Sequence, residues 1–130
     1  MAASPDARTP VFIDGGRLPF QRSGTGYVDL MAYDMGRMAL KGLLMRTGLD
    51  ASTIDRVIMG TVVQDVETSN VARESALAAG IPNTVPAHTV TQACISSNQA
   101  VTSGMDLIRA GQGDVVVASG TETLSDPPIR

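Results

Sequence analysis

The chain has 130 residues, of which 43% are hydrophobic and 18% charged, and its formal net charge is −3. This length and composition favour one ordered domain with a sizeable core over a disordered chain. With 10 basic and 13 acidic residues, 3% aromatic residues and no tryptophan, the chain lacks the basic patches and stacking platforms of nucleic-acid-binding proteins. We therefore expect no nucleic-acid partner.

Residues 11–13 form a short apolar run followed by Asp14 and two glycines, which predicts a strand and a turn. Residues 29–46 are predicted to form a helix that ends at Gly48. One stripe at helical spacing is expected to face the core. Its members are Met31, Met35, Met38, Gly42 and Met45.

Residues 56–63 are predicted to form a second strand, with an apolar centre at residues 57–59. A second helix is expected over residues 70–79, because Ser69 or Asn70 can cap its start. Gly80 is the residue type that commonly ends a helix, and a proline two positions later prevents continuation.

A third strand is predicted over residues 85–91, a third helix over residues 94–110 and a fourth strand over residues 114–119. The fourth strand is apolar throughout residues 115–118, which indicates burial on both faces. The order β-α-β-α-β-α-β predicts an α/β fold with a mostly parallel or mixed sheet. The final residues, 126–130, are expected to leave the sheet as an extended segment.

The third predicted helix carries unusually small side chains and few charges, which suits a buried helix packed between two layers. Four strands form only one such layer, so a second layer is expected from elsewhere. Charged residues occur only near its C-terminal end, at Asp106 and Arg109.

Cys94, the only cysteine, lies between an apolar strand and the start of this helix. A disulfide within the chain is therefore excluded, and a reducing compartment is indicated. Free N–H groups at a helix start favour a thiolate and can hold the oxygen of a thioester. Cys94 is the candidate nucleophile, with a buried structural cysteine as the alternative.

The remaining candidate residues are weaker. His88 is the only histidine, and an extended segment would hold it on the order of 20 Å from Cys94, too far to act as its base. Glu122 and Asp126 flank a turn at the end of the fourth strand, where stabilising the turn is favoured over a catalytic role. Metal-ligand spacing is absent, and the glycines near residue 25 form no phosphate-binding motif.

Taken together, these segments resemble the thiolase family along almost the whole chain. Arg17 and Pro19 match the family's early R-x-P turn, and Cys94 falls at its nucleophile position. The departures are Ser119 for glycine and Leu124 for methionine. The matching segments are, in chain order, residues 17–20, 60–64, 70–73, 86–90, 111–114 and 119–125.

The residues around Cys94 are most similar to the thiolase subunit of the fatty-acid-oxidation trifunctional complex, because Ser97 stands where the commoner C-x-S-G form has glycine. This resemblance implies thiolytic cleavage of 3-ketoacyl-CoA through an acyl-cysteine intermediate, with coenzyme A as a substrate and no bound cofactor or metal. It also implies a homo-oligomer paired through the N-terminal half and a hydratase/dehydrogenase partner subunit. A cytoplasmic location is expected for a bacterial enzyme, and a mitochondrial one for a eukaryotic enzyme.

The resemblance further implies that residues 1–130 are a thiolase N-terminal domain. The family's coenzyme A-binding loop region and C-terminal half, which supplies an activating histidine and a second cysteine, are expected outside it. The isolated chain is therefore expected to be inactive. Two alternatives remain: a biosynthetic condensing thiolase that forms acetoacetyl-CoA, and a non-catalytic interaction fragment or subunit.

Overall fold

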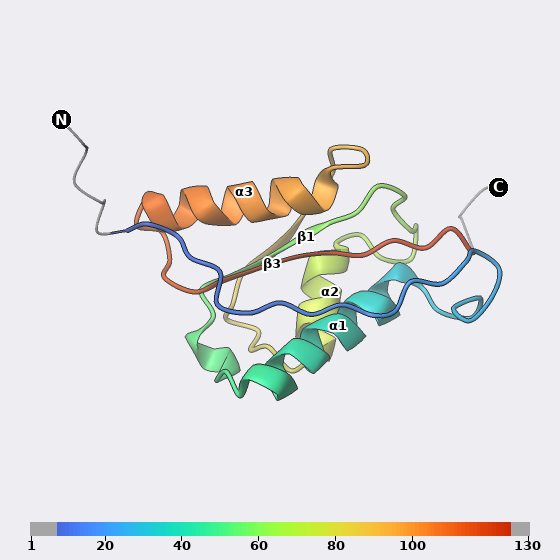
Figure 1. The fold of residues 1–130 in the computed structure, drawn as a ribbon, viewed down its shortest axis with the longest axis horizontal. Coiled ribbons are helices and arrows are strands. Elements are labelled where there is room, and N and C mark those ends of the chain that lie inside the picture. Colours follow the sequence, from blue (N-terminus) through green and yellow to red (C-terminus); the bar gives the residue numbers. More distant parts are fainter. Residues whose placement is uncertain (1–7, 126–130) are drawn as a thin grey trace.

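The computed structural model describes residues 8–125, which form a three-stranded parallel sheet with helices on both faces (Figure 1). The strand order is β2-β1-β3, so β1 is central. The predicted α/β class and parallel sheet are confirmed. The elements are α1 (Ala32–Thr47), the 3-10 turn η1 (Ala51–Thr53), β1 (Arg56–Gly60), α2 (Val71–Ala78), β2 (Ala87–Val90), α3 (Ser96–Arg109) and β3 (Val116–Gly120).

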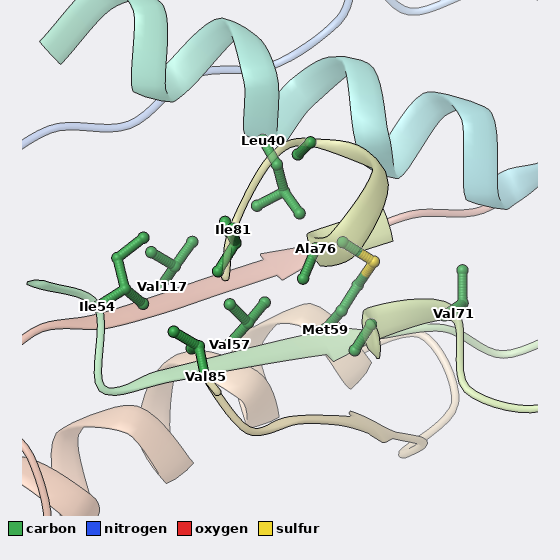
Figure 2. Close-up of a cluster of buried hydrophobic side chains, with 11 residues drawn as sticks. Leu40, Ile54, Val57, Met59, Val71, Ala76, Ile81, Val85 and Val117 are labelled. Carbon is green, nitrogen blue, oxygen red and sulfur yellow. The ribbon is translucent and has the colours of Figure 1, made fainter. Parts of the chain in front are cut away.

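The main core lies between the sheet and the α1–α2 layer. Side chains alternate across a strand, so Val57 and Met59 of β1 point into this core and Ile58 points to the opposite face. All three are 0% exposed, as expected for the central strand. Figure 2 shows Val57 and Met59 gathered with Leu40 of α1 and Ala76 of α2.

Helix α3 packs on the other face of the sheet (Figure 1). Its buried residues are small: Ser96, Ala100 and Gly104. A Cβ atom on Gly104 would lie 3.0 Å from Val116 Cγ1, so the helix lies close against β3. Within residues 8–125 the sheet covers only one side of α3. The helix is thus buried on one face, and the second layer expected for it is not among these elements.

Most predicted helix ends are confirmed. Gly48 ends α1 in the left-handed region with φ 66°, and Asn70 caps α2 by accepting from the Arg73 N–H through its side chain. Asn70 Nδ2 also donates to the Ala87 carbonyl oxygen at 3.1 Å. The Arg73 guanidinium donates to the Val85 carbonyl oxygen at 2.7 Å. These two side chains therefore fasten the start of α2 to β2 and the residues just before it.

The strand predicted at residues 11–13 does not form. Val11, Phe12 and Ile13 are 70–87% exposed, and no strand of the described residues pairs with them. A strand needs a hydrogen-bonded neighbour, and the polar contacts of this segment lead elsewhere. Arg8 is paired with Asp114 at 2.6 Å, and Asp14 is paired with Arg46 of α1. The order observed is therefore α-β-α-β-α-β.

The methionine stripe predicted for the first helix is wrong as a core face. Met35 is buried, but Met38 is 38% and Met45 77% exposed. The buried face of α1 carries Ala32, Met35, Gly36 and Leu40 instead. Small residues decide the contact, because a Cβ on Gly36 would lie 2.6 Å from Ser75 Oγ. Methionine is apolar enough to suggest a core, but flexible enough to remain at the surface.

The fourth predicted strand, now β3, is only partly buried. Val117 is 7% exposed, and its neighbours Val116 and Ala118 are half-buried. The expectation of burial on both faces fails because β3 lies at an edge of the described sheet, whereas β1 occupies the centre. The segment predicted at residues 126–130, with Asp126, lies outside the described residues. No helix within residues 8–125 has the length and apolar character needed to cross a membrane.

Candidate functional site

The three parallel strands end at one edge of the sheet, and each is followed by a threonine. Thr61 N–H donates to the Val90 carbonyl oxygen at 3.1 Å, and Thr121 N–H donates to the Gly60 carbonyl oxygen at 3.0 Å. The Thr91 hydroxyl donates to the Thr61 carbonyl oxygen at 2.6 Å. These bonds tie the three loops together where ligands of parallel α/β proteins commonly bind.

Cys94 lies in the loop between β2 and α3, at this edge, and its side chain is exposed. The preceding residue, Ala93, has φ 46°, a left-handed conformation that is unfavourable for residues with a Cβ. Tight backbone bonds hold it there. Ile95 N–H donates to the Gln92 carbonyl oxygen at 3.2 Å, and Ser96 N–H donates to that of Ala93 at 3.1 Å. The cysteine is therefore presented on a constrained turn.

The Ser96 hydroxyl forms two hydrogen bonds that hold this turn together. It accepts from the Gln92 N–H at 2.8 Å and donates to the Ala93 carbonyl oxygen at 2.7 Å. Ser96 is 3% exposed, so both bonds are shielded from water. A buried hydroxyl with a donor and an acceptor partner fixes the conformation of the residues on both sides of it. Ser96 was not among the candidate site residues predicted from sequence, although a hydroxyl two residues after the cysteine could have indicated a role in the turn.

Two glycines allow the first turn of α3 to approach the sheet. Gly60 and Gly120 are register partners on β1 and β3. A Cβ on Gly60 would lie 2.3 Å from the Ser96 carbonyl carbon and 2.5 Å from the Ser97 nitrogen. Both distances are shorter than Cβ atoms show in proteins. Glycine is thus required at position 60 to bring the backbone after Cys94 against β1.

Glu122 joins two loops at the same edge. Its carboxylate accepts from the Val62 N–H at 2.7 Å and from the Val63 N–H at 3.2 Å. The role favoured from sequence, stabilisation of a turn, agrees with this geometry, but the turn held is the one after β1. Glu122 therefore fixes the loop after β1 to the loop after β3.

His88 lies away from Cys94 along α3. It borders a shallow hollow next to the C-terminal half of that helix, whereas Cys94 precedes the N-terminal end. Partial burial lowers the pKa of His88, and the positive charge of Arg56 lowers it further. The structure does not bring His88 and Cys94 together. The residues around the hollow are Ile58, His88, Ser103, Asp106, Leu107, Ala110 and Gln112.

Metal binding finds no support in this part of the chain. Residues 8–125 contain no cluster of three or more histidine, cysteine, aspartate or glutamate side chains suited to a metal ion. A narrow cavity under the loop after β1 is bordered by Thr61, Gln64 and Thr89 but not by Cys94. The arrangement that can do chemistry is therefore an exposed thiol, held on a constrained turn at the start of a helix.

A parallel α/β layer with a cysteine turn at its carboxyl edge defines the class of this domain, and comparison with known families gives its membership. The family described as "Thiolase, N-terminal domain" matches residues 11–130. The chain belongs to the thiolase family, as its sequence motifs indicate.

Among curated relatives, the chain is 57% identical over 128 residues to the human mitochondrial trifunctional enzyme subunit beta, covering 98% of this chain and 27% of that protein. It is 51% identical over 120 residues to a probable 3-ketoacyl-CoA thiolase of Caenorhabditis elegans, covering 92% of this chain and 27% of the relative. The resemblance to the trifunctional branch is confirmed. The chain spans about a quarter of the length of these relatives.

Solved structures share the fold. An acetyl-CoA acetyltransferase of Bacillus anthracis superimposes with a TM-score of 0.78 at 32% identity, covering 88% of this chain and 27% of its own. The Acat5 thiolase of Ascaris suum, solved in complex with coenzyme A, gives a TM-score of 0.79 at 30% identity, covering 83% of this chain and 28% of its own. The predicted thiolase-like layered fold is confirmed.

Proposed function

We propose that this chain is the nucleophile-bearing N-terminal domain of a 3-ketoacyl-CoA thiolase of fatty-acid β-oxidation, with Cys94 as the nucleophile. The observation that carries the proposal is the exposed Cys94 thiol on a constrained turn at the start of α3. Family membership and the thiolase names of its relatives support the same activity.

In the proposed reaction, the Cys94 thiolate attacks the ketone carbon of a 3-ketoacyl-CoA. The bond between carbons 2 and 3 then breaks, and its electron pair passes to carbon 2, which takes a proton and leaves as acetyl-CoA. The thiol of a second coenzyme A attacks the acyl-cysteine thioester, so the shortened acyl-CoA leaves and the thiolate is restored. We propose that N–H groups in the first turn of α3 other than those of Ile95 and Ser96, which bind carbonyl oxygens of the turn, stabilise the negative charge on the substrate oxygen.

The base that activates Cys94 and the acid that protonates carbon 2 are proposed to come from the remaining part of a full-length enzyme. His88 is an unsuitable base, because it borders the opposite end of α3. We also propose that the contacts to coenzyme A lie outside this chain, because the chain spans only 27% of the length of its human relative. Coenzyme A is thus a substrate, and no resident cofactor is proposed.

Two partners belong to the proposal. The first is a second copy, paired along β2, which is an edge strand of the described sheet. Residues 85–90 carry no formally charged side chain when His88 is neutral, which suits burial. We expect light scattering of the full-length enzyme at micromolar concentration to show at least a dimer, and an active monomer alone would refute this.

The second partner is a hydratase/dehydrogenase subunit, suggested by the trifunctional name of relatives.

For location, we propose the bacterial cytoplasm. One lysine against nine arginines hints at a GC-rich bacterial genome, and the single cysteine fits a reducing compartment. If the source is eukaryotic, the mitochondrial names of the relatives favour that organelle instead.

The test of the nucleophile is Cys94→Ser in the full-length enzyme. We expect thiolysis of a 3-ketoacyl-CoA to fall on the order of a thousandfold or more, because a serine hydroxyl is far less nucleophilic at neutral pH. Mass spectrometry of wild type given substrate without free coenzyme A should find the acyl group on the Cys94 peptide. His88→Gln is the matched control and should keep its activity within a few-fold. Near-normal turnover by Cys94→Ser would refute the assignment.

Two alternatives are separated by simple assays. A biosynthetic condensing thiolase would form acetoacetyl-CoA from acetyl-CoA and prefer the shortest substrate, a reading favoured by the acetyl-CoA acetyltransferase among similar structures. A non-catalytic interaction fragment or subunit would keep Cys94 without enhanced reactivity, so its alkylation by iodoacetamide near pH 7 would be no faster than that of free cysteine.

A further inference from the structure

The two glycines under the first turn of α3 differ in what occupies the space above them. Above Gly60 lies the backbone of Ser96 and Ser97. Above Gly120 lies a side chain: a Cβ there would be 1.7 Å from Ser97 Oγ and 2.8 Å from Ser97 Cβ. The next nearest atom is the Gly60 carbonyl oxygen at 3.4 Å, which is an ordinary van der Waals distance.

A side chain at position 97 and a side chain at position 120 therefore exclude each other. Rotating the Ser97 hydroxyl would not solve the conflict, because Ser97 Cβ itself lies below 3.0 Å from the added carbon. A side chain at position 120 must displace the helix turn or the end of β3, unless position 97 is also glycine.

A displacement at Ser97 would reach Cys94 directly. Only Ile95 and Ser96 separate the two residues, and both are hydrogen-bonded into the turn. Ser96 binds the residues before the cysteine through its hydroxyl, so the turn and the start of α3 move as one unit. The Ser97–Gly120 contact thus affects the position of the Cys94 thiol at the carboxyl edge of the sheet.

We propose that Ser97 and Gly120 are a complementary steric pair that positions the Cys94 turn on β3. The proposal rests on the proposed function only in taking Cys94 as the nucleophile. Ser97 and Gly120 are positioning residues, since neither is required to touch the reacting atoms. The pair implies a rule for this branch: serine at position 97 requires glycine at position 120, whereas glycine at position 97 would tolerate alanine there.

The experiment is a double-mutant series in the full-length enzyme. Gly120→Ala should lower kcat about a hundredfold, the loss expected for a displacement near 1 Å, with KM changed less than kcat. Ser97→Gly removes both conflicting atoms, so Ser97→Gly/Gly120→Ala should recover most of the lost kcat. Ser97→Ala removes Oγ but keeps Cβ and should restore only part of it.

Gly60→Ala is the matched control, because its conflict is with backbone atoms that no substitution at position 97 removes. We expect Ser97→Gly to give Gly60→Ala no rescue. Alkylation of the Cys94 peptide between pH 6 and 9 and thermal unfolding are measured for every variant. If Gly120→Ala does not fold, recovery of a folded protein in the double mutant supports the pair.

Normal kcat and alkylation in Gly120→Ala would overturn the proposal, as would a double mutant no better than Gly120→Ala. These outcomes are separable from failure of the proposed function. If Cys94→Ser keeps its activity, the nucleophile assignment fails, but the steric pair is still tested by the rescue of thermal stability and of the alkylation profile.

Discussion

At the scale of single residues, the site depends on neighbours of Cys94 that carry no reactive group. Ala93 holds an unfavourable φ of 46°, a conformation that costs an alanine about 1–2 kcal/mol. The buried Ser96 hydroxyl supplies two hydrogen bonds that hold it there. Local strain of this kind persists only where the surroundings enforce it.

His88 gives a pH prediction at this scale. Burial lowers its pKa in the folded protein, and Arg56 adds to the effect, whereas the ordinary value of 6.5 applies after unfolding. Well above pH 6.5 both states hold a neutral imidazole, so His88 contributes no pH dependence there. As the pH falls through 6.5, the unfolded chain takes up the proton first and the folded state loses stability.

We expect His88→Gln to flatten the decline in unfolding free energy between about pH 7 and 5.5, measured by urea unfolding, because glutamine does not titrate. This pH range lies above the lowered carboxyl pKa values of Asp50 and Asp55, so these two carboxyl groups do not titrate in it. An equally steep decline in the variant would show that other groups cause it.

At the scale of elements, close backbone approach selects which helix face is buried. Helix α1 approaches α2 most closely at Gly36, next to Ser75, and its larger methionines at positions 38 and 45 remain at the surface. Helix α3 likewise meets the sheet through Ser96, Ala100 and Gly104. Small residues allow both close approaches; they were recognised from sequence in the third helix, whereas in the first helix the methionine pattern concealed them.

The two glycines of α1 provide a paired test. Gly36→Ala should destabilise the protein by about 1–3 kcal/mol through overpacking, because its Cβ would lie 2.6 Å from Ser75 Oγ and 3.1 Å from Met59 Sδ. Gly42→Ala meets nothing within 4 Å and should stabilise by about 0.5–1 kcal/mol through helix propensity. Thermal or urea unfolding measures both. Equal effects of the two substitutions would contradict this account of the α1–α2 contact.

At the scale of the whole molecule, α3 is covered by the sheet on one side only within residues 8–125. The hollow that His88 borders lies where the C-terminal half of α3 meets β1 and β2. The chain corresponds to 27% of its human relative. The only histidine, His88, lies away from the only cysteine, Cys94, so within residues 8–125 no histidine is positioned to carry protons to or from the thiol.

We therefore expect the 130-residue chain to show no measurable thiolysis of a 3-ketoacyl-CoA by itself. Loss of one general acid or base typically lowers a rate about a hundredfold to ten-thousandfold, and two such groups are needed here. The assay compares the chain with its Cys94→Ala variant. Turnover that disappears in Cys94→Ala would mean that a base exists within this chain.

The sequence by itself determined much of this protein: the α/β class, the order of helices and strands from residue 29 onward, and the capping residues Asn70 and Gly48. These follow from local chemistry, namely periodicity, helix caps and turn residues, which a single sequence displays. The sequence also indicated Cys94 as the candidate nucleophile, because a single cysteine between a strand and the start of a helix can be recognised without a structure.

Only the tertiary structure decided the rest. Residues 11–13 read as a strand, but a strand forms only where another backbone offers hydrogen bonds. The apolar sequence of β3 predicted burial on both faces, but β3 lies at an edge of the described sheet. The contacts of Gly60 and Gly120 with Ser96 and Ser97 join residues more than 20 positions apart in the chain. Such close approaches are set by how layers pack in space, and no local pattern in the chain encodes them.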